Sequence, residues 1–163
     1  MSTKTATLNL VGDMRFEAQV GSGHTIVMDD GDGDTGARPA ELVGAALGGC
    51  TAMDVISILR KKRQPVTAYE VRVTGVQEEA HPHNFTRFDV VHVIDGEGID
   101  PEAVRRAIEL SGTKYCSVGS TLASGALEVH HHSLIRTPGA ADQQAEVLVT
   151  GPNTLPAELA ARA

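Results

Sequence analysis

The chain has 163 residues, which is enough for one domain with a sizeable core. Its apolar share of 41% and charged share of 21% are typical of a soluble globular protein. A formal net charge of −7 argues against nucleic-acid binding. The first residues form no apolar signal core, and no apolar run approaches the roughly 20 residues of a membrane span. We therefore expect a cytoplasmic protein that binds neither nucleic acid nor a membrane.

Three short strands are predicted near the N-terminus. Apolar residues alternate loosely with polar ones over residues 5–11, 15–20 and 25–28, and glycine-containing turns separate these runs. A Gly/Asp-rich loop follows, up to Arg38.

A long helix is predicted to begin at Pro39, because apolar residues then recur every three or four positions and proline suits the first helical position. The pattern ends at the basic run before Pro65. Apolar residues cover most of the helix circumference, which predicts burial on more than one side.

The second half of the chain predicts two more strands, two helices and a closing strand. Alternating runs around Val71 and Val90 indicate the strands, and Asp100 is a candidate N-cap for a helix that ends near Leu110. A short helix carrying Cys116 and a strand over residues 126–129 follow. The order βββ-α-ββ-α-α-β indicates an α+β domain over residues 1–135. Residues 136–163 are expected to be a tail, either flexible or packed on the surface.

Cys50 and Cys116 are the only cysteines, so sulfur redox chemistry has to use this pair or a partner molecule. Two cysteines make no disulfide framework, which favours a reducing compartment. Gly44, Gly48 and Gly49 precede Cys50, each at a cost of roughly 1 kcal/mol in a helix. They predict a close neighbour or a pocket beside the sulfur. A second interpretation is that Gly48 and Gly49 loosen the turn before Cys50, so that free backbone amides point at the sulfur and lower the thiol pKa.

Several segments resemble the osmotically inducible protein C and organic hydroperoxide resistance (OsmC/Ohr) family. The similar segments are residues 39–42, 49–55, 69–76, 107–111 and 114–118. The likeness is greatest to a subgroup of the family without an assigned substrate.

The resemblance implies an intertwined homodimer that buries the long helices together. It implies that Cys50 attacks the peroxide and Cys116 resolves the product, with help from Arg15 and Glu41. Ala40 stands where the peroxidase branch has its glutamate, and Ser117 stands where that branch has a proline.

The predicted function is thiol-dependent reduction of organic hydroperoxides in oxidative-stress defence. Its partners would be the hydroperoxide, an external thiol reductant and a second copy of the chain. The alternative is a dimeric protein of the same fold that binds a small apolar ligand without peroxidase activity.

No cofactor and no metal are predicted. The acids of residues 30–36 together with Glu41 partly match a calcium loop, but Thr35 replaces the turn glycine. Only His130 and His132 of the triple-histidine run share a strand face, and no carboxylate or cysteine is their neighbour in the local sequence.

Overall fold

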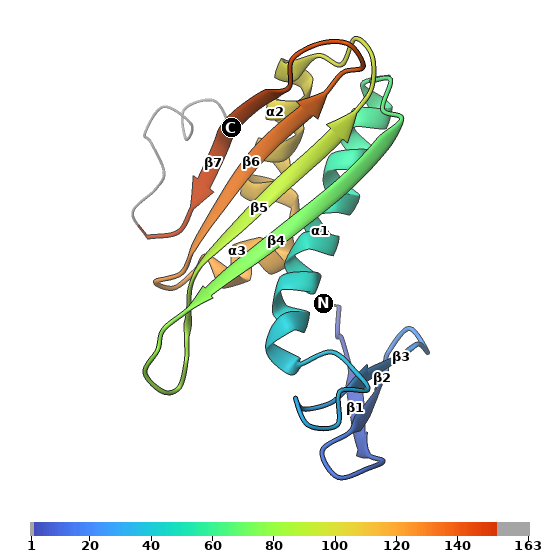
Figure 1. Ribbon diagram of the computed structural model, residues 1–163, viewed down its shortest axis with the longest axis vertical. Helices are drawn as coiled ribbons and strands as arrows, with labels where there is room; N and C mark the ends of the chain where they lie inside the picture. Colours follow the sequence, from blue (N-terminus) through green and yellow to red (C-terminus); the bar gives the residue numbers. More distant parts are fainter. Residues whose placement is uncertain (1, 153–163) are drawn as a thin grey trace. The chain divides into compact units, whose positions relative to one another are not determined.

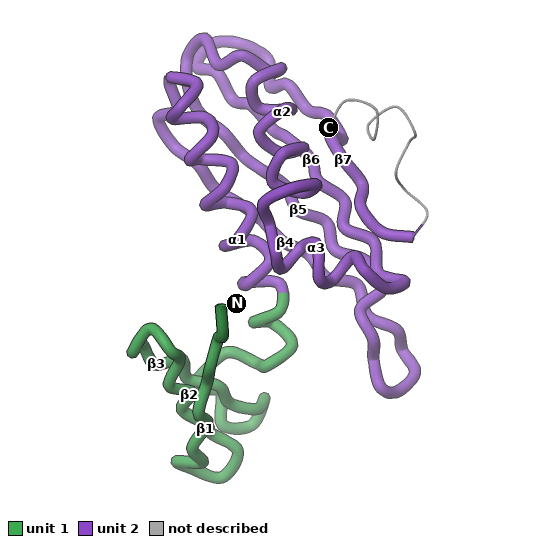
Figure 2. Tube along the Cα trace, turned by 180° about the vertical axis from the view of Figure 1, so that it is seen from behind, with its two compact units in different colours: residues 1–43 green, residues 44–163 purple. Residues whose placement is uncertain are grey.

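The first three strands form an antiparallel sheet of their own. In the computed structural model, which describes residues 2–152, the order is β1-β2-β3 (Figure 1). The strands are β1 (Ala6–Leu10), β2 (Phe16–Val20) and β3 (Thr25–Met28). Each bound agrees with its predicted range to within one residue. This sheet belongs to one compact unit, residues 1–43, and residues 44–163 form the other (Figure 2).

Helix α1 (Pro39–Lys61) has 23 residues and begins at the predicted proline. It is the one helix of residues 2–152 that is long and apolar enough to cross a membrane, a test that the core helix of a soluble protein also passes. Within the single chain, 28% of its apolar window is buried. Leu47, Val55 and Leu59 of this helix are fully buried, which indicates a core helix.

The larger sheet has the strand order β4-β5-β6-β7. Its strands are β4 (Ala68–Gln77), β5 (Phe85–Asp95), β6 (Glu128–Arg136) and β7 (Gln143–Thr150). β5 and β6 are parallel, whereas the other two pairs are antiparallel. A parallel pair needs a crossover connection, here made by α2 (Pro101–Leu110), the π-helical segment η1 (Ser111–Tyr115) and α3 (Ser117–Leu122). Asp100 caps α2 as predicted, since its side chain accepts a hydrogen bond from the Glu102 amide.

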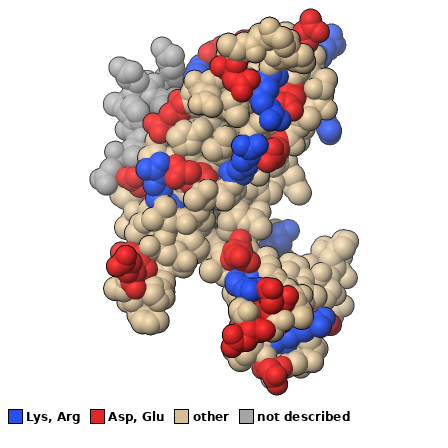
Figure 3. Space-filling view, in the orientation of Figure 1, with Lys and Arg blue, Asp and Glu red and all other residues tan. Residues whose placement is uncertain are grey.

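The helices cover one face of this sheet, as Figures 1 and 2 show from opposite sides. Side chains of β5 and β6 alternate between that face and the outer one. Val90, Ile94 and Val129 are buried beneath the helices. The outer face carries ion pairs, including Arg72 with Glu70, so Lys/Arg and Asp/Glu groups lie side by side on it (Figure 3).

The α+β class is confirmed, with differences in three elements. The predicted closing strand of residues 126–129 is the longer β6, which reaches Arg136. β7 lies within residues 136–163, where no strand was predicted, and its Leu148 is buried. Cys116 precedes α3 as its N-cap and does not lie inside a helix. Residues 153–163 of the expected tail lie outside the described residues, and the division at residue 135 stays a prediction.

Candidate active site

The structure brings the two thiols together. Cys50 lies on α1, and Cys116 lies between η1 and α3; both are free. Their sulfur atoms and a carboxylate oxygen of Asp54 all lie within 4.8 Å of one another. A disulfide needs sulfurs about 2.05 Å apart, so a small movement of side chains would bring the thiols into bonding distance.

The backbone around Cys116 fixes the direction of its sulfur. The residue is extended, with φ −72° and ψ 97°, and its amide donates to the Ser111 carbonyl at 2.8 Å. Its Sγ accepts a hydrogen bond of 3.2 Å from the Gly119 amide. A Cβ at Gly119 would stand 3.3 Å from that sulfur, so glycine leaves the room that this arrangement needs.

The two thiols differ in their electrostatic setting. Cys116 is 3% exposed, and burial raises its pKa to about 12. A hydrogen bond to Cys50 and the negative charge of Asp54 act in the same direction. Cys116 is therefore a neutral thiol at pH 7. Cys50 is half-buried and so is the more accessible of the two thiols.

Asp54 is a site residue that the sequence analysis missed. Its carboxylate accepts a hydrogen bond of 3.0 Å from the Ser111 hydroxyl, which also lies 3.0 Å from the Thr51 hydroxyl. The signal that could have found it is its spacing, because residues four apart on a helix share a face. Cys50 and Asp54 have that spacing on α1.

A second group of hydrogen-bonded polar side chains, also not predicted, lies on the larger sheet. The Tyr69 hydroxyl is 2.7 Å from His92 Nδ1, and His92 Nε2 is 3.4 Å from His131 Nδ1. Burial raises the pKa of Tyr69 and lowers that of His92 to about 3 and that of His131 to about 4. Tyrosine is therefore the donor, and both imidazoles are neutral. Asp54 also raises the Tyr69 pKa, which links this hydrogen-bonded group electrostatically to the thiol site.

The glycines before Cys50 allow α1 to pack closely on the sheet. A Cβ at Gly48 would lie 2.8 Å from Val73 Cγ2, whereas one at Gly49 would meet nothing within 4 Å. The close neighbour that we predicted is therefore β4, on the Gly48 side of the helix. The interpretation that these glycines free backbone amides is wrong, because α1 is continuous and its interior amides donate within the helix.

Arg15 and Glu41 lie in the unit of residues 1–43. Arg15 contacts Glu17 at 3.5 Å, and its Nε is the one buried side-chain nitrogen or oxygen of residues 2–152 without a hydrogen-bond partner. The Glu41 carboxylate accepts a hydrogen bond of 2.9 Å from the Arg38 amide at the start of α1. The structure thus assigns Glu41 a capping contact, and the catalytic roles of both residues stay predictions.

The thiol site and the acidic loop each carry several groups that metal ions bind. Two thiols and the Asp54 carboxylate are a donor set that suits a soft divalent ion. In the acidic loop, Asp30 accepts hydrogen bonds from the amides of Asp32 and Gly33, and Asp34 pairs with Arg38. The loop's side chains are thus engaged with the loop itself, which favours a solvated turn over a calcium site.

Comparisons with known proteins agree with the fold. A family model described as OsmC-like protein matches residues 31–132. Protein YhfA of Escherichia coli K12 is 38% identical over 130 residues, which cover 80% of this chain and 97% of YhfA.

Solved structures show the same architecture. A hypothetical protein from Aquifex aeolicus has a TM-score of 0.75 at 26% identity, covering 84% of this chain and 98% of that one. An organic hydroperoxide resistance protein from Elizabethkingia anophelis has a TM-score of 0.57 at 16% identity, covering 84% and 97%. At that identity the second likeness shows the fold alone.

Proposed function

This chain belongs to the OsmC-like protein family, and we propose on that basis that it reduces organic hydroperoxides with its two cysteines. The observation that carries the proposal is the pairing of the thiols. Their sulfurs lie within 4.8 Å of each other, with Cys116 buried and Cys50 half-buried. Solved relatives named organic hydroperoxide resistance proteins share the fold.

In the first step the Cys50 thiolate attacks the terminal oxygen of the hydroperoxide. The O–O bond breaks, an S–O bond forms, and the alkoxide takes a proton and leaves as an alcohol. Cys50 is then a sulfenic acid. The Cys116 sulfur attacks it, the S–O bond breaks, and water leaves as the disulfide forms. An external dithiol, oxidised in turn, reduces the disulfide by thiol exchange.

We propose that Arg15 and Glu41 assist, as the family resemblance implies. A cation beside the attacking sulfur stabilises the thiolate and the departing alkoxide. Arg15 has a guanidinium nitrogen, Nε, that is buried without a hydrogen-bond partner, which supports a role toward a ligand or a second chain. Glu41 would orient that cation.

The functional form is proposed to be a homodimer. Met53, on the same helix as Cys50, is 74% exposed in the single chain. Leu10 and Met14 are 60% and 57% exposed. Exposed apolar surface of this kind is typical of protein–protein interfaces, and a second copy would cover it. We further propose a cytoplasmic location and a role in oxidative-stress defence, which suit two reduced thiols.

The proposal is tested by titrating the reduced protein with cumene hydroperoxide. One equivalent should consume both thiols within seconds and release one equivalent of cumyl alcohol. Cys50→Ser should abolish the reaction, whereas Cys116→Ser should complete one turnover and leave a sulfenic acid on Cys50 that dimedone traps. A stable oxidation on Cys116 with turnover intact in Cys50→Ser would reverse the two roles.

A second candidate function is binding of a small apolar ligand at the same thiols. It is favoured by the setting of Cys116, because burial and the nearby Asp54 carboxylate raise the pKa of that thiol and keep it unreactive. Ala40 and Ser117, which depart from the peroxidase pattern, favour it too. Loss of thiols over hours in the cumene hydroperoxide titration would support this function and reject the peroxidase.

A further inference from the structure

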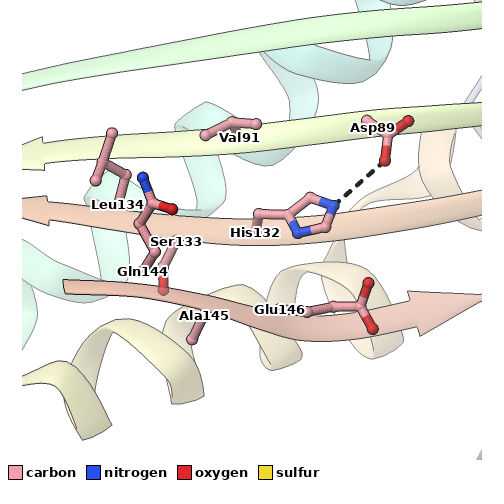
Figure 4. A pocket seen from close by; sticks show the side chains of 8 residues that line it. All are labelled: Asp89, Val91, His132, Ser133, Leu134, Gln144, Ala145 and Glu146. Carbon is pink, nitrogen blue, oxygen red and sulfur yellow. Dashed lines mark hydrogen bonds and ion pairs between the residues drawn. The ribbon is translucent and has the colours of Figure 1, made fainter.

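The outer face of the larger sheet gathers imidazoles and carboxylates from three neighbouring strands. Ligand atoms of Asp89 on β5 and of His130 and His132 on β6 all lie within 4.8 Å of one another. Glu146 on β7 adds a carboxylate oxygen 3.3 Å from His130 Nδ1. Figure 4 shows Asp89, His132 and Glu146 on their three strands around one shallow depression.

Strand register creates this cluster. Residues two apart on a strand share a face, so His130 and His132 both point outward while His131 is buried. The parallel register places Asp89 opposite His130, and the antiparallel register places Glu146 opposite His132. Glu128, two residues before His130, is a carboxylate that the sequence analysis overlooked, and strand register brings Asp89 and Glu146 to the same face.

Two of the distances match those between neighbouring ligands of one metal ion. His132 Nε2 lies 3.3 Å from Asp89 Oδ1, the same separation as between His130 and Glu146. Bonds of about 2.0–2.1 Å at tetrahedral angles place neighbouring ligand atoms roughly 3.3 Å apart. Two imidazoles and two carboxylates are a donor set that zinc commonly takes in proteins.

Neighbouring groups would hold these ligands in place. His130 Nε2 lies 3.1 Å from a Glu128 carboxylate oxygen, so whichever ring nitrogen binds the ion, the other can donate to a carboxylate. Such carboxylate–histidine–metal arrangements orient the ring. Arg87 donates to both oxygens of Asp89, from Nε to Oδ2 at 2.9 Å and from Nη2 to Oδ1. Each carboxylate oxygen has two lone pairs, so Oδ1 keeps one for the ion while it accepts from Arg87.

The side chains are also accessible from solvent. Their exposed fractions are 14% for His130, 27% for His132 and 24% for Asp89. An ion can therefore enter, while much of each ligand's packing against neighbouring side chains is kept.

We propose that Asp89, His130, His132 and Glu146 form a binding site for one Zn²⁺ ion per chain. The site lies on the sheet face opposite the helices, and it is independent of the thiol chemistry. A bound ion would cross-link β5, β6 and β7.

The test is calorimetric titration of chelator-treated protein with zinc chloride. Because the thiols and Asp54 could also take zinc, the titration uses the full chain carrying Cys50→Ser and Cys116→Ser. One ion per chain is expected to bind. His130→Ala/His132→Ala should abolish binding, and Asp89→Asn should weaken it by at least about tenfold.

His81→Ala/His83→Ala is the matched control, since it also removes two neighbouring exposed imidazoles, with ring centroids 4.3 Å apart. This control should bind zinc like its parent. Equal binding by the His130/His132 variant and its parent would overturn the proposal, as would no binding by the parent.

A second readout identifies the ligands without relying on substitutions. Co²⁺ at the proposed site should give the visible bands of a tetrahedral nitrogen and oxygen site in the parent and no such bands in His130→Ala/His132→Ala. Octahedral Co²⁺ bands in the parent would contradict the assignment. Circular dichroism of each metal-free variant checks that it is folded.

Discussion

The Ser111 hydroxyl donates a hydrogen bond of 3.0 Å to the Asp54 carboxylate and so joins the crossover connection to α1 beside both thiols. Ser111 has no exposed surface. A buried hydroxyl in such a position holds the carboxylate in one orientation, and its loss leaves buried polar groups unpaired.

Ser111→Ala should therefore lower the free energy of unfolding by about 1–3 kcal/mol. Ser120→Ala is the control, because Ser120 is exposed on α3 and its substitution should cost less than about 0.5 kcal/mol. Urea unfolding followed by circular dichroism measures both. Equal midpoints for the two variants would mean that the Ser111–Asp54 bond contributes nothing to stability.

The buried His92 predicts a loss of stability in acid. Burial lowers its pKa to about 3 in the folded protein, against about 6.5 when unfolded, so the unfolded chain binds the proton more readily. The His92 contribution is complete above about pH 6.5 and is lost as the pH falls toward 3. Within that window the free energy of unfolding falls by about 1.4 kcal/mol per pH unit. Because pH 7 lies above the window, the fall between pH 7 and pH 5 is about 2 kcal/mol.

His92→Asn keeps an acceptor near the Tyr69 hydroxyl and removes this titration. The difference in unfolding free energy between pH 7 and pH 5 should shrink by about 2 kcal/mol relative to the native chain. Guanidinium unfolding at the two pH values, with a chelator present, gives the comparison. If the variant and the native chain lose the same unfolding free energy between pH 7 and pH 5, the pKa of His92 is not lowered in the folded protein.

Gly48 and Gly49 are adjacent on α1 but should respond oppositely to alanine. A Cβ at Gly48 would lie 2.8 Å from Val73 Cγ2, and the branched valine has little freedom to move away. Gly48→Ala should thus destabilise by about 1–3 kcal/mol. Gly49→Ala faces open space within the chain and gains up to about 1 kcal/mol of helix propensity. In thermal unfolding, Gly48→Ala should have a lower midpoint temperature than Gly49→Ala. The reverse order would contradict the packing of α1 on β4.

The proposed homodimer predicts a defect for Met53→Glu. This change puts a charge on the exposed side of α1, where a second copy is proposed to pack, and should yield a 17.1 kDa monomer in sedimentation velocity. Lys62→Glu, in the exposed basic run after α1, adds negative charge elsewhere and should leave the assembly intact. A native chain that sediments as a monomer at micromolar concentration would refute the homodimer.

Local patterns in the sequence predicted most of the elements. Proline at the start of α1 and Asp100 before α2 are signals that act within a turn or two, and both elements begin where those signals stand. β7 was not predicted because its first residues, Gln143 and Gln144, have no apolar alternation. It forms because the edge of β6 offers it a partner.

The polar groups of the sites were harder to predict. Ser111 reaches Asp54 across 57 residues, and His132 reaches Asp89 across 43. Such pairs depend on the crossover and on strand register, which no local pattern specifies. The proximity of the two cysteines came only from family resemblance, because the segment between them contains β4, β5 and α2.

That segment has a consequence for heat resistance. A disulfide between Cys50 and Cys116 would close a loop of about 65 residues that contains the sheet's β4–β5 hairpin and helix α2. In the chain-entropy description, such a closure removes about 4 kcal/mol of disorder from the unfolded state. Under the proposed mechanism, the oxidised protein is therefore the harder form to melt. Each reduction by an external thiol would return the chain to its more easily unfolded form. The unfolding temperature would therefore differ between the oxidised and the reduced protein.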